Sequence, residues 1–176
     1  MLIDSSSRRN LELVETLREK QKRGSLLWVL DKTRTAMGAR LLRSYVEQPL
    51  IDEDEINARL DAVEALTGQA MIREEIREYL RPVYDLERLV GRISYQSANP
   101  RDLIAFKSSL QMLPYIKQLL NSFDGDALAQ IQEDLDPLED LYQLVDAAIV
   151  GKFLGVDALA AVGSTGAINF LIIGFC

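Results

Sequence analysis

The sequence contains no histidine, and its one cysteine is the final residue, Cys176. Histidine is the side chain that most readily exchanges protons near neutral pH, so histidine-based catalysis and histidine–cysteine zinc sites are excluded. A single cysteine excludes an internal disulfide and suits a reducing cytoplasm. The first ten residues also lack the apolar stretch of a secretory signal peptide, so we do not expect the body of the chain to be secreted.

Basic residues are also fewer than acidic ones. Lys and Arg number 20 against 27 Asp and Glu, which gives a net charge of -7. Such a chain has no bulk attraction for phosphate, so contact with nucleic acid would need a local basic patch. The 176 residues, 48% hydrophobic and 27% charged, suit about one ordinary globular domain. These averages exclude a disordered chain and argue against a standalone basic DNA-binding protein.

Alternating patterns typical of strands are also missing, whereas apolar residues recur at helical spacing along most of the chain. Capping residues and prolines bound the helical segments. Pro114 is expected to kink the longest segment, and residues 25–30 are expected to form a short apolar turn. The sequence therefore predicts an all-α, multi-helix fold, with helices over residues 6–16, 35–48, 52–66, 72–80, 86–93, 100–120, 126–135 and 138–149.

The composition changes near Val145. Residues 145–176 contain only three charged side chains, and residues 158–176 contain none. A run of 19 uncharged residues is close to the roughly 20 that a helix needs to cross a bilayer. A buried core helix or an apolar hairpin is the alternative. The sequence thus predicts two parts, a helical body over 1–144 and a hydrophobic segment over 145–176 that associates with a membrane if 158–176 inserts.

Residue patterns for catalysis and metal binding are weak. The glycine-containing stretch 163–170 lacks the Lys-Ser/Thr pair with which a P-loop binds phosphate and magnesium. The carboxylates at 53–55, and those at 133, 134, 136, 139 and 140, could bind a hard cation, but helix-start acids and a solvated face explain them better. We therefore assign no catalytic, cofactor-binding or metal-binding residue.

One basic loop could hold phosphate. It contains Arg18, Lys20, Lys22 and Arg23, and we predict these four side chains as weak phosphate contacts. A solvated loop whose cations form ion pairs within the chain is the favoured alternative, because no aromatic residues are interleaved. The same basic region also includes Arg8, Arg9, Arg40 and Arg43.

Seven motifs occur in a fixed order along the first two thirds of the chain. They are RRNLEL at 8–13, GSLL at 24–27, LDKTRTAMGARLL at 30–42, QPL at 48–50, RLDAVE at 59–64, DLERL at 85–89 and NPRDL at 99–103. Together they resemble the core, or lever, domain of the MutS family of DNA mismatch-repair proteins, over about residues 1–149.

The resemblance implies an all-helical set of levers that transmits between an ATPase domain and a DNA clamp. In that family the whole protein binds mismatched duplex DNA, dimerises, and uses ATP and magnesium in a P-loop domain that we do not expect in this chain. We therefore expect a cytoplasmic fragment that is not an enzyme, holds no cofactor and has no activity alone. Because other helices complete the family core, the apolar stripes at 56–66 and 103–120 should lack part of their cover, which favours self-association.

The tail resembles a different family. Residues 141–155 and 157–163 are similar to the first membrane helices of multidrug and toxic compound extrusion (MATE) transporters, and the resemblance is placed at about 141–176. The two resemblances overlap at 141–150, which suggests a chimera or a misassembled reading frame. The alternative function is therefore a membrane-anchored protein whose tail derives from a multidrug/cation antiporter.

Overall fold

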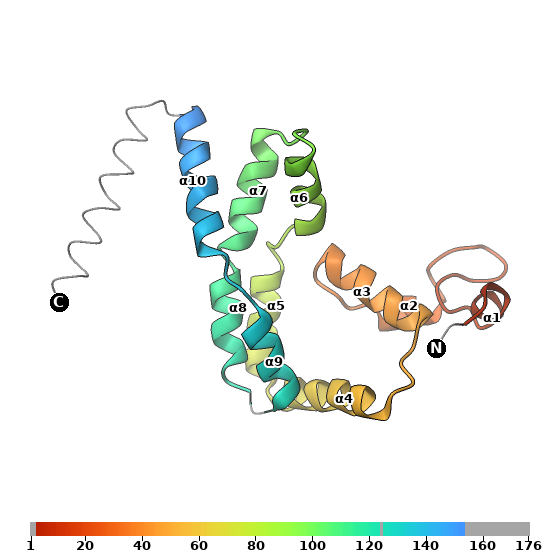
Figure 1. The fold of residues 1–176 in the computed structure, drawn as a ribbon. Helices are drawn as coiled ribbons and strands as arrows, with labels where there is room; N and C mark the ends of the chain where they lie inside the picture. Colours follow the sequence, from red (N-terminus) through yellow and green to blue (C-terminus); the bar gives the residue numbers. More distant parts are fainter. Residues whose placement is uncertain (1–2, 124, 154–176) are drawn as a thin grey trace.

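The computed structural model describes residues 3–123 and 125–153. Within these residues all the regular secondary structure is helical, as the sequence predicts (Figure 1). The helices are α1 (Ser5–Asn10), α2 (Leu26–Leu30), α3 (Ala36–Glu47), α4 (Glu53–Gly68), α5 (Ala70–Leu80), α6 (Leu86–Ser94), α7 (Pro100–Leu110), α8 (Leu113–Leu120), α9 (Asp126–Asp134) and α10 (Glu139–Phe153).

Side-chain caps explain where most of these helices begin. The clearest case is α7, where Asn99 accepts a hydrogen bond from the Asp102 backbone N–H at 2.9 Å and Asp102 accepts one from the Asn99 N–H at 3.0 Å. This reciprocal capping box, with Pro100 at the first helical position, fixes the start of the helix. Single side-chain caps begin α1, α2, α3, α4 and α6, at Asp4, Ser25, Thr35, Asp52 and Asp85.

Three predicted segments differ from the structure. The first helix ends at Asn10, because Glu12 adopts a left-handed backbone (φ 48°) and turns the chain away. Residues 26–30 form a helix rather than a turn, since Ser25 caps them. Pro114 does not kink one long helix: α7 ends at Leu110, and Pro114 lies in the first turn of α8, where its missing N–H leaves no hydrogen bond unmade.

Two hydrophobic clusters form the core. The first cluster joins α6, α7, α8 and α10 through Leu89, Phe106, Leu110, Leu113 and Val145. The second cluster joins α8 and α9 through Ile116, Leu120, Phe123 and Leu128, with partly buried residues of α4 and α5 packed against it. Figure 1 shows the corresponding arrangement, with α6, α7 and α10 stacked above α5, α8 and α9.

The two apolar stripes expected to lack cover behave differently. On α4 the expectation is confirmed, since Ile56, Leu60 and Val63 are 38%, 58% and 58% exposed. At 103–120 it is wrong, because Phe106 and Leu110 are 4% and 1% exposed. Helices α6 and α10 pack on that stripe and supply its cover.

Helix α10 crosses the predicted boundary between residues 144 and 145. Val145 is buried in the first cluster, and Asp146 forms an ion pair with Lys107 of α7 that raises the pKa of this lysine. Ile149 is partly buried against the same cluster. Part of the low charge after Val145 therefore reflects packing against α7. The predicted membrane span at 158–176 and the glycine-containing stretch at 163–170 lie outside the described residues.

Helices α1, α2 and α3 form a unit of their own (Figure 1). No residue of these helices belongs to either hydrophobic cluster. The chain leaves α3 through residues 48–52, which have no regular secondary structure, and enters α4. We call α1–α3 the N-terminal unit and α4–α10 the bundle.

Candidate functional site

The predicted phosphate-contacting loop is a turn with its own internal hydrogen bonds. The Thr16 backbone N–H donates to the Gln21 carbonyl at 2.9 Å, and the Lys20 N–H donates to the Thr16 carbonyl at 3.1 Å. The Ser25 hydroxyl, which is buried, donates to the Lys22 carbonyl at 2.7 Å. The loop is thereby held against the start of α2.

Gly24 makes the return of this loop possible. Its φ of 95° lies in the left-handed region, where residues with a Cβ are strained. A Cβ at this position would also lie 3.2 Å from the Thr16 Cγ2 methyl group. Glycine is therefore favoured here by its backbone conformation, and the close approach of Thr16 adds to that preference.

The four predicted side chains are all exposed, but they are not equivalent. Lys22 forms an ion pair with Asp31, whereas Arg18, Lys20 and Arg23 have no carboxylate partner among the described residues. Glu15 and Glu19 lie on the same loop and reduce its positive charge. The loop therefore presents three exposed cations in a weakly positive setting, and contact between them and phosphate stays a prediction.

Three of the four other arginines of the predicted basic region form ion pairs elsewhere, whereas Arg9 is exposed and has no carboxylate partner among the described residues. Arg43 and Arg8 lie 3.0 Å and 3.9 Å from the Glu47 carboxylate, and Arg40 binds two carboxylates at the start of α6. A pocket of about 230 Å³ lies between the loop, α2 and α3, lined by Val14, Lys22, Leu27, Ala39, Arg40 and Arg43. An anion entering this pocket would compete with a carboxylate for each of its three cations.

Two basic residues were not assigned to this region from the sequence. Lys32 and Arg34 are exposed, have no ion-pair partner among the described residues, and follow Asp31, which the Lys22 contact brings to the loop. Both residues belong to the motif at 30–42. The sequence does not show that this motif lies beside the basic loop, because that depends on how the chain folds. The basic surface is therefore broader than the predicted four residues.

The Lys22–Asp31 contact gives a testable electrostatic signature. Hydrogen bonds from the Lys22 ammonium and then from the Thr33 hydroxyl lower the pKa of Asp31 from 3.8 to about 2. Because the folded-state pKa lies below the unfolded value, this contact stabilises the fold above pH 3.8, and its contribution is lost as the pH falls toward 2. We expect Lys22→Met to raise the pKa of Asp31 in an NMR titration.

The matched control for that titration is Lys20→Met. Lys20 is an exposed cation on the same loop, without a carboxylate partner among the described residues, so its removal should leave the pKa of Asp31 almost unchanged. An equal rise in the two variants would mean that Asp31 senses the general charge of the loop and not the contact with Lys22.

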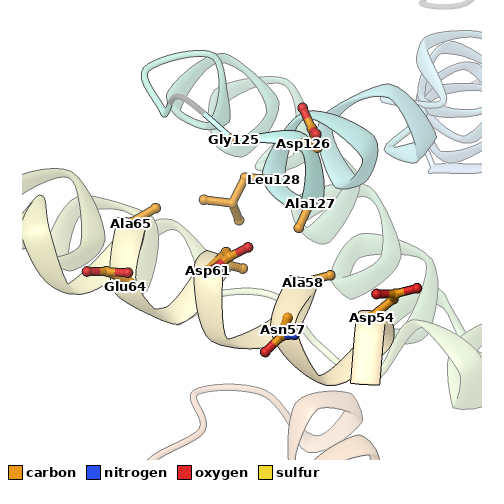
Figure 2. A pocket seen from close by; sticks show the side chains of 11 residues that line it. Asp54, Asn57, Ala58, Asp61, Glu64, Ala65, Gly125, Asp126, Ala127 and Leu128 are labelled. Carbon is orange, nitrogen blue, oxygen red and sulfur yellow. The ribbon is translucent and has the colours of Figure 1, made fainter. Parts of the chain in front are cut away.

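A larger groove lies between α4 and α9 and has the opposite charge (Figure 2). It encloses about 630 Å³ and includes the carboxylates of Asp54, Asp61, Glu64 and Asp126 among its lining residues. In Figure 2, Ala127 and Leu128 point from α9 toward α4, whereas Asp126 points away from α4. No three carboxylates within the described part of the chain gather closely enough to hold a metal ion. The groove therefore repels phosphate and brings no reactive groups together.

The match to known families covers most of the chain. The model for MutS domain III matches residues 6–154. The chain belongs to the MutS domain III family. This agrees with the seven motifs and with the helical fold.

Several relatives are similar over the same length of chain, and each is called DNA mismatch repair protein MutS. The protein of Lachnoclostridium phytofermentans is 69% identical over 149 residues, which is 85% of this chain and 16% of the relative. Those of Ruminiclostridium cellulolyticum and Acetivibrio thermocellus are 56% and 52% identical, over 86% and 85% of this chain and 17% of each relative. The chain thus spans about one sixth of the length of these relatives.

The family match does not support the predicted chimera. The MutS domain III match includes residues 141–154, the first part of the 141–176 stretch that resembles a MATE transporter, and α10 packs against α7 through this region. The apolar character that suggested a transporter there has a structural cause, since Val145 and Ile149 face the first cluster. Among the described residues, none of the helices combines the length and the hydropathy needed to cross a bilayer.

Proposed function

We propose that this chain is the core element of a DNA mismatch-repair protein and acts mechanically, relaying movement between a DNA clamp and an ATPase without catalysing a reaction itself. The family match over residues 6–154, with a relative at 69% identity, is the observation that carries this proposal. Binding of mismatched duplex DNA, use of ATP and magnesium, dimerisation and a cytoplasmic location are proposed for the whole protein.

The bundle has the continuity that a relay needs. Leu135 packs against both hydrophobic clusters, and Lys117 of α8 donates a hydrogen bond to the Leu135 carbonyl at 2.7 Å. The buried Ser109 hydroxyl of α7 accepts a hydrogen bond from the Tyr84 backbone N–H at 2.9 Å, which ties α7 to the segment before α6. A displacement at one end of such a packed body reaches the other end because close-packed interiors deform little.

The proposal assigns the basic loop only a secondary role. Arg18, Lys20 and Arg23 would strengthen a contact with DNA made elsewhere by neutralising phosphate charge, and phosphate contacts carry no preference for a mismatch. The exposed apolar side chains on α4 support self-association of the isolated chain, because surfaces of this kind find partners.

A segment exchange tests the relay directly. Residues 6–154 would replace the aligned segment of the L. phytofermentans relative, and the mutation rate would be measured in cells lacking their own mismatch-repair protein. We expect the hybrid to suppress mutation nearly as well as the intact relative, and the isolated chain to suppress none. Suppression by the isolated chain, or none by a stable, folded hybrid, would contradict the proposal.

A second hybrid separates relay from direct DNA contact. It carries Arg18→Gln, Lys20→Gln and Arg23→Gln, which remove the three free cations of the loop while leaving the Lys22–Asp31 pair intact. We expect it to retain most of the suppression. If repair disappears at unchanged protein level, phosphate binding by the loop is essential, and the mechanical assignment is incomplete.

A further inference from the structure

The N-terminal unit and the bundle are joined by few specific contacts. Within the part of the chain that the structure describes, they share no hydrophobic cluster. The chain connection between them, residues 48–52, contains no helix, and Ile51 within it is 74% exposed. The position of the unit therefore depends strongly on the polar contacts that cross between the two parts.

Arg40 makes the ion pairs that cross. This side chain of α3 binds the Asp85 carboxylate in a bidentate manner, with Nη1–Oδ2 and Nη2–Oδ1 distances of 2.6 and 2.9 Å, and its Nη2 also binds Glu87. The other ion pairs among the described residues lie within one part or the other. Asp85 caps α6 and Glu87 lies in its first turn, so Arg40 contacts the N-terminus of that helix.

A second arginine, Arg59 of the bundle, contacts the N-terminal unit. The guanidinium carbon of Arg59, on α4, lies 3.7 Å from the centre of the Tyr45 ring of α3. This cation–π contact is near the linker and Arg40 is farther along α3, so the unit is held at two points along one helix. Contact at two points fixes the orientation of α3 relative to the bundle.

The ion pairs of Arg40 are exposed enough to break and re-form. The side chains of Arg40 and Glu87 are 49% and 73% exposed, so water and salt compete with the ion pairs. The bidentate geometry still defines one docked position, because the planar guanidinium matches the carboxylate in a single orientation. The contact therefore selects one docked orientation of the N-terminal unit while stabilising that orientation only weakly.

We propose that the Arg40–Asp85–Glu87 contact is a salt-sensitive latch that holds the N-terminal unit docked on α6, and that the unit swings about residues 48–52 when the latch opens. In the whole protein the latch would serve the proposed relay, and this role alone rests on the proposed function. The latch is a property of this chain and is tested on this chain alone.

The test is a distance measurement by pulsed electron paramagnetic resonance on the full chain. Spin labels would be placed at Lys32→Cys and Arg101→Cys, which are exposed positions in the unit and the bundle, with Cys176→Ser to remove the native thiol. Unlabelled chain in excess suppresses signals between molecules. We expect one main distance at low salt and a broader distribution at high salt, because screening weakens the latch.

Arg40→Gln should give the broad distribution of spin-label distances already at low salt. We expect the ratio of docked to undocked chains to fall threefold to fivefold. The distribution should then no longer depend on salt. The matched control is Arg43→Gln, which loses a cation of the same helix whose partner, Glu47, is also on α3. It should behave like the unmodified chain. Circular dichroism establishes that each variant keeps its helices.

Two results would overturn the latch. One is a distribution in Arg40→Gln that matches the parent chain at every salt concentration. The other is equal broadening in Arg43→Gln, which would show a general effect of charge. Since the measurement involves neither DNA nor repair, its failure would leave the segment exchange unaffected, and the reverse also holds.

Discussion

Truncation of Leu110 to alanine is expected to lower the free energy of unfolding by about 2 to 5 kcal/mol, the usual cost of a cavity at a buried leucine. Leu110 is 1% exposed and contacts the first hydrophobic cluster, where α6, α7, α8 and α10 meet. Its removal weakens contacts to several helices at once. For a domain of this size, such a loss is a large part of the total stability.

Urea unfolding followed by circular dichroism measures this effect, and Leu60→Ala is the matched control. Leu60 is also a helical leucine, but it is 58% exposed on α4, so the same change in helix propensity occurs without a cavity. We expect its unfolding free energy to change by about 0.5 kcal/mol or less. Equal losses at the two positions would mean that Leu110 is not in a packed core.

The helices were predictable because their signals are local. Asp52, Asp85 and Asn99 each cap a helix through hydrogen bonds to residues no more than three positions away. Such contacts depend on short-range geometry that a sequence pattern records directly. The proline signals were equally local, although Pro114 lies in the first turn of α8 instead of bending one long helix.

The contacts that matter for the candidate site were not predictable in this way. Arg40 is 45 and 47 residues from its partners Asp85 and Glu87, and nothing in the local pattern links them. The same holds for the cover that α10 supplies to Leu110. Pairings of this kind depend on how the chain closes, which a single sequence does not specify.

Within α10, the low charge after Val145 has a physical explanation other than a membrane. A composition average treats an apolar residue alike whether it faces lipid or a protein core. In α10, Val145 and Ile149 are one helical turn apart and both pack against the first cluster, whereas Leu144 is 66% exposed. The spacing of these residues is therefore more informative than their number.

Neighbouring substitutions on α10 test most directly whether the mismatch-repair core continues through the predicted boundary at 144/145. Val145→Asp places a charge at a position that is 8% exposed, whereas Leu144→Asp places the same charge at one that is 66% exposed. Burial of an unpaired carboxylate is among the most destabilising of single changes, so we expect Val145→Asp to cost roughly 4 kcal/mol or more. Leu144→Asp should cost about 1 kcal/mol or less.

The unfolding free energies of the two variants, measured in urea against the parent chain, decide the question. A large loss for Val145→Asp beside a small one for Leu144→Asp would show that α10 is an integral part of the core. Small and equal losses would contradict the account, because they would mean that residues beyond 144 contribute nothing to the helical core and that the family fold ends before α10.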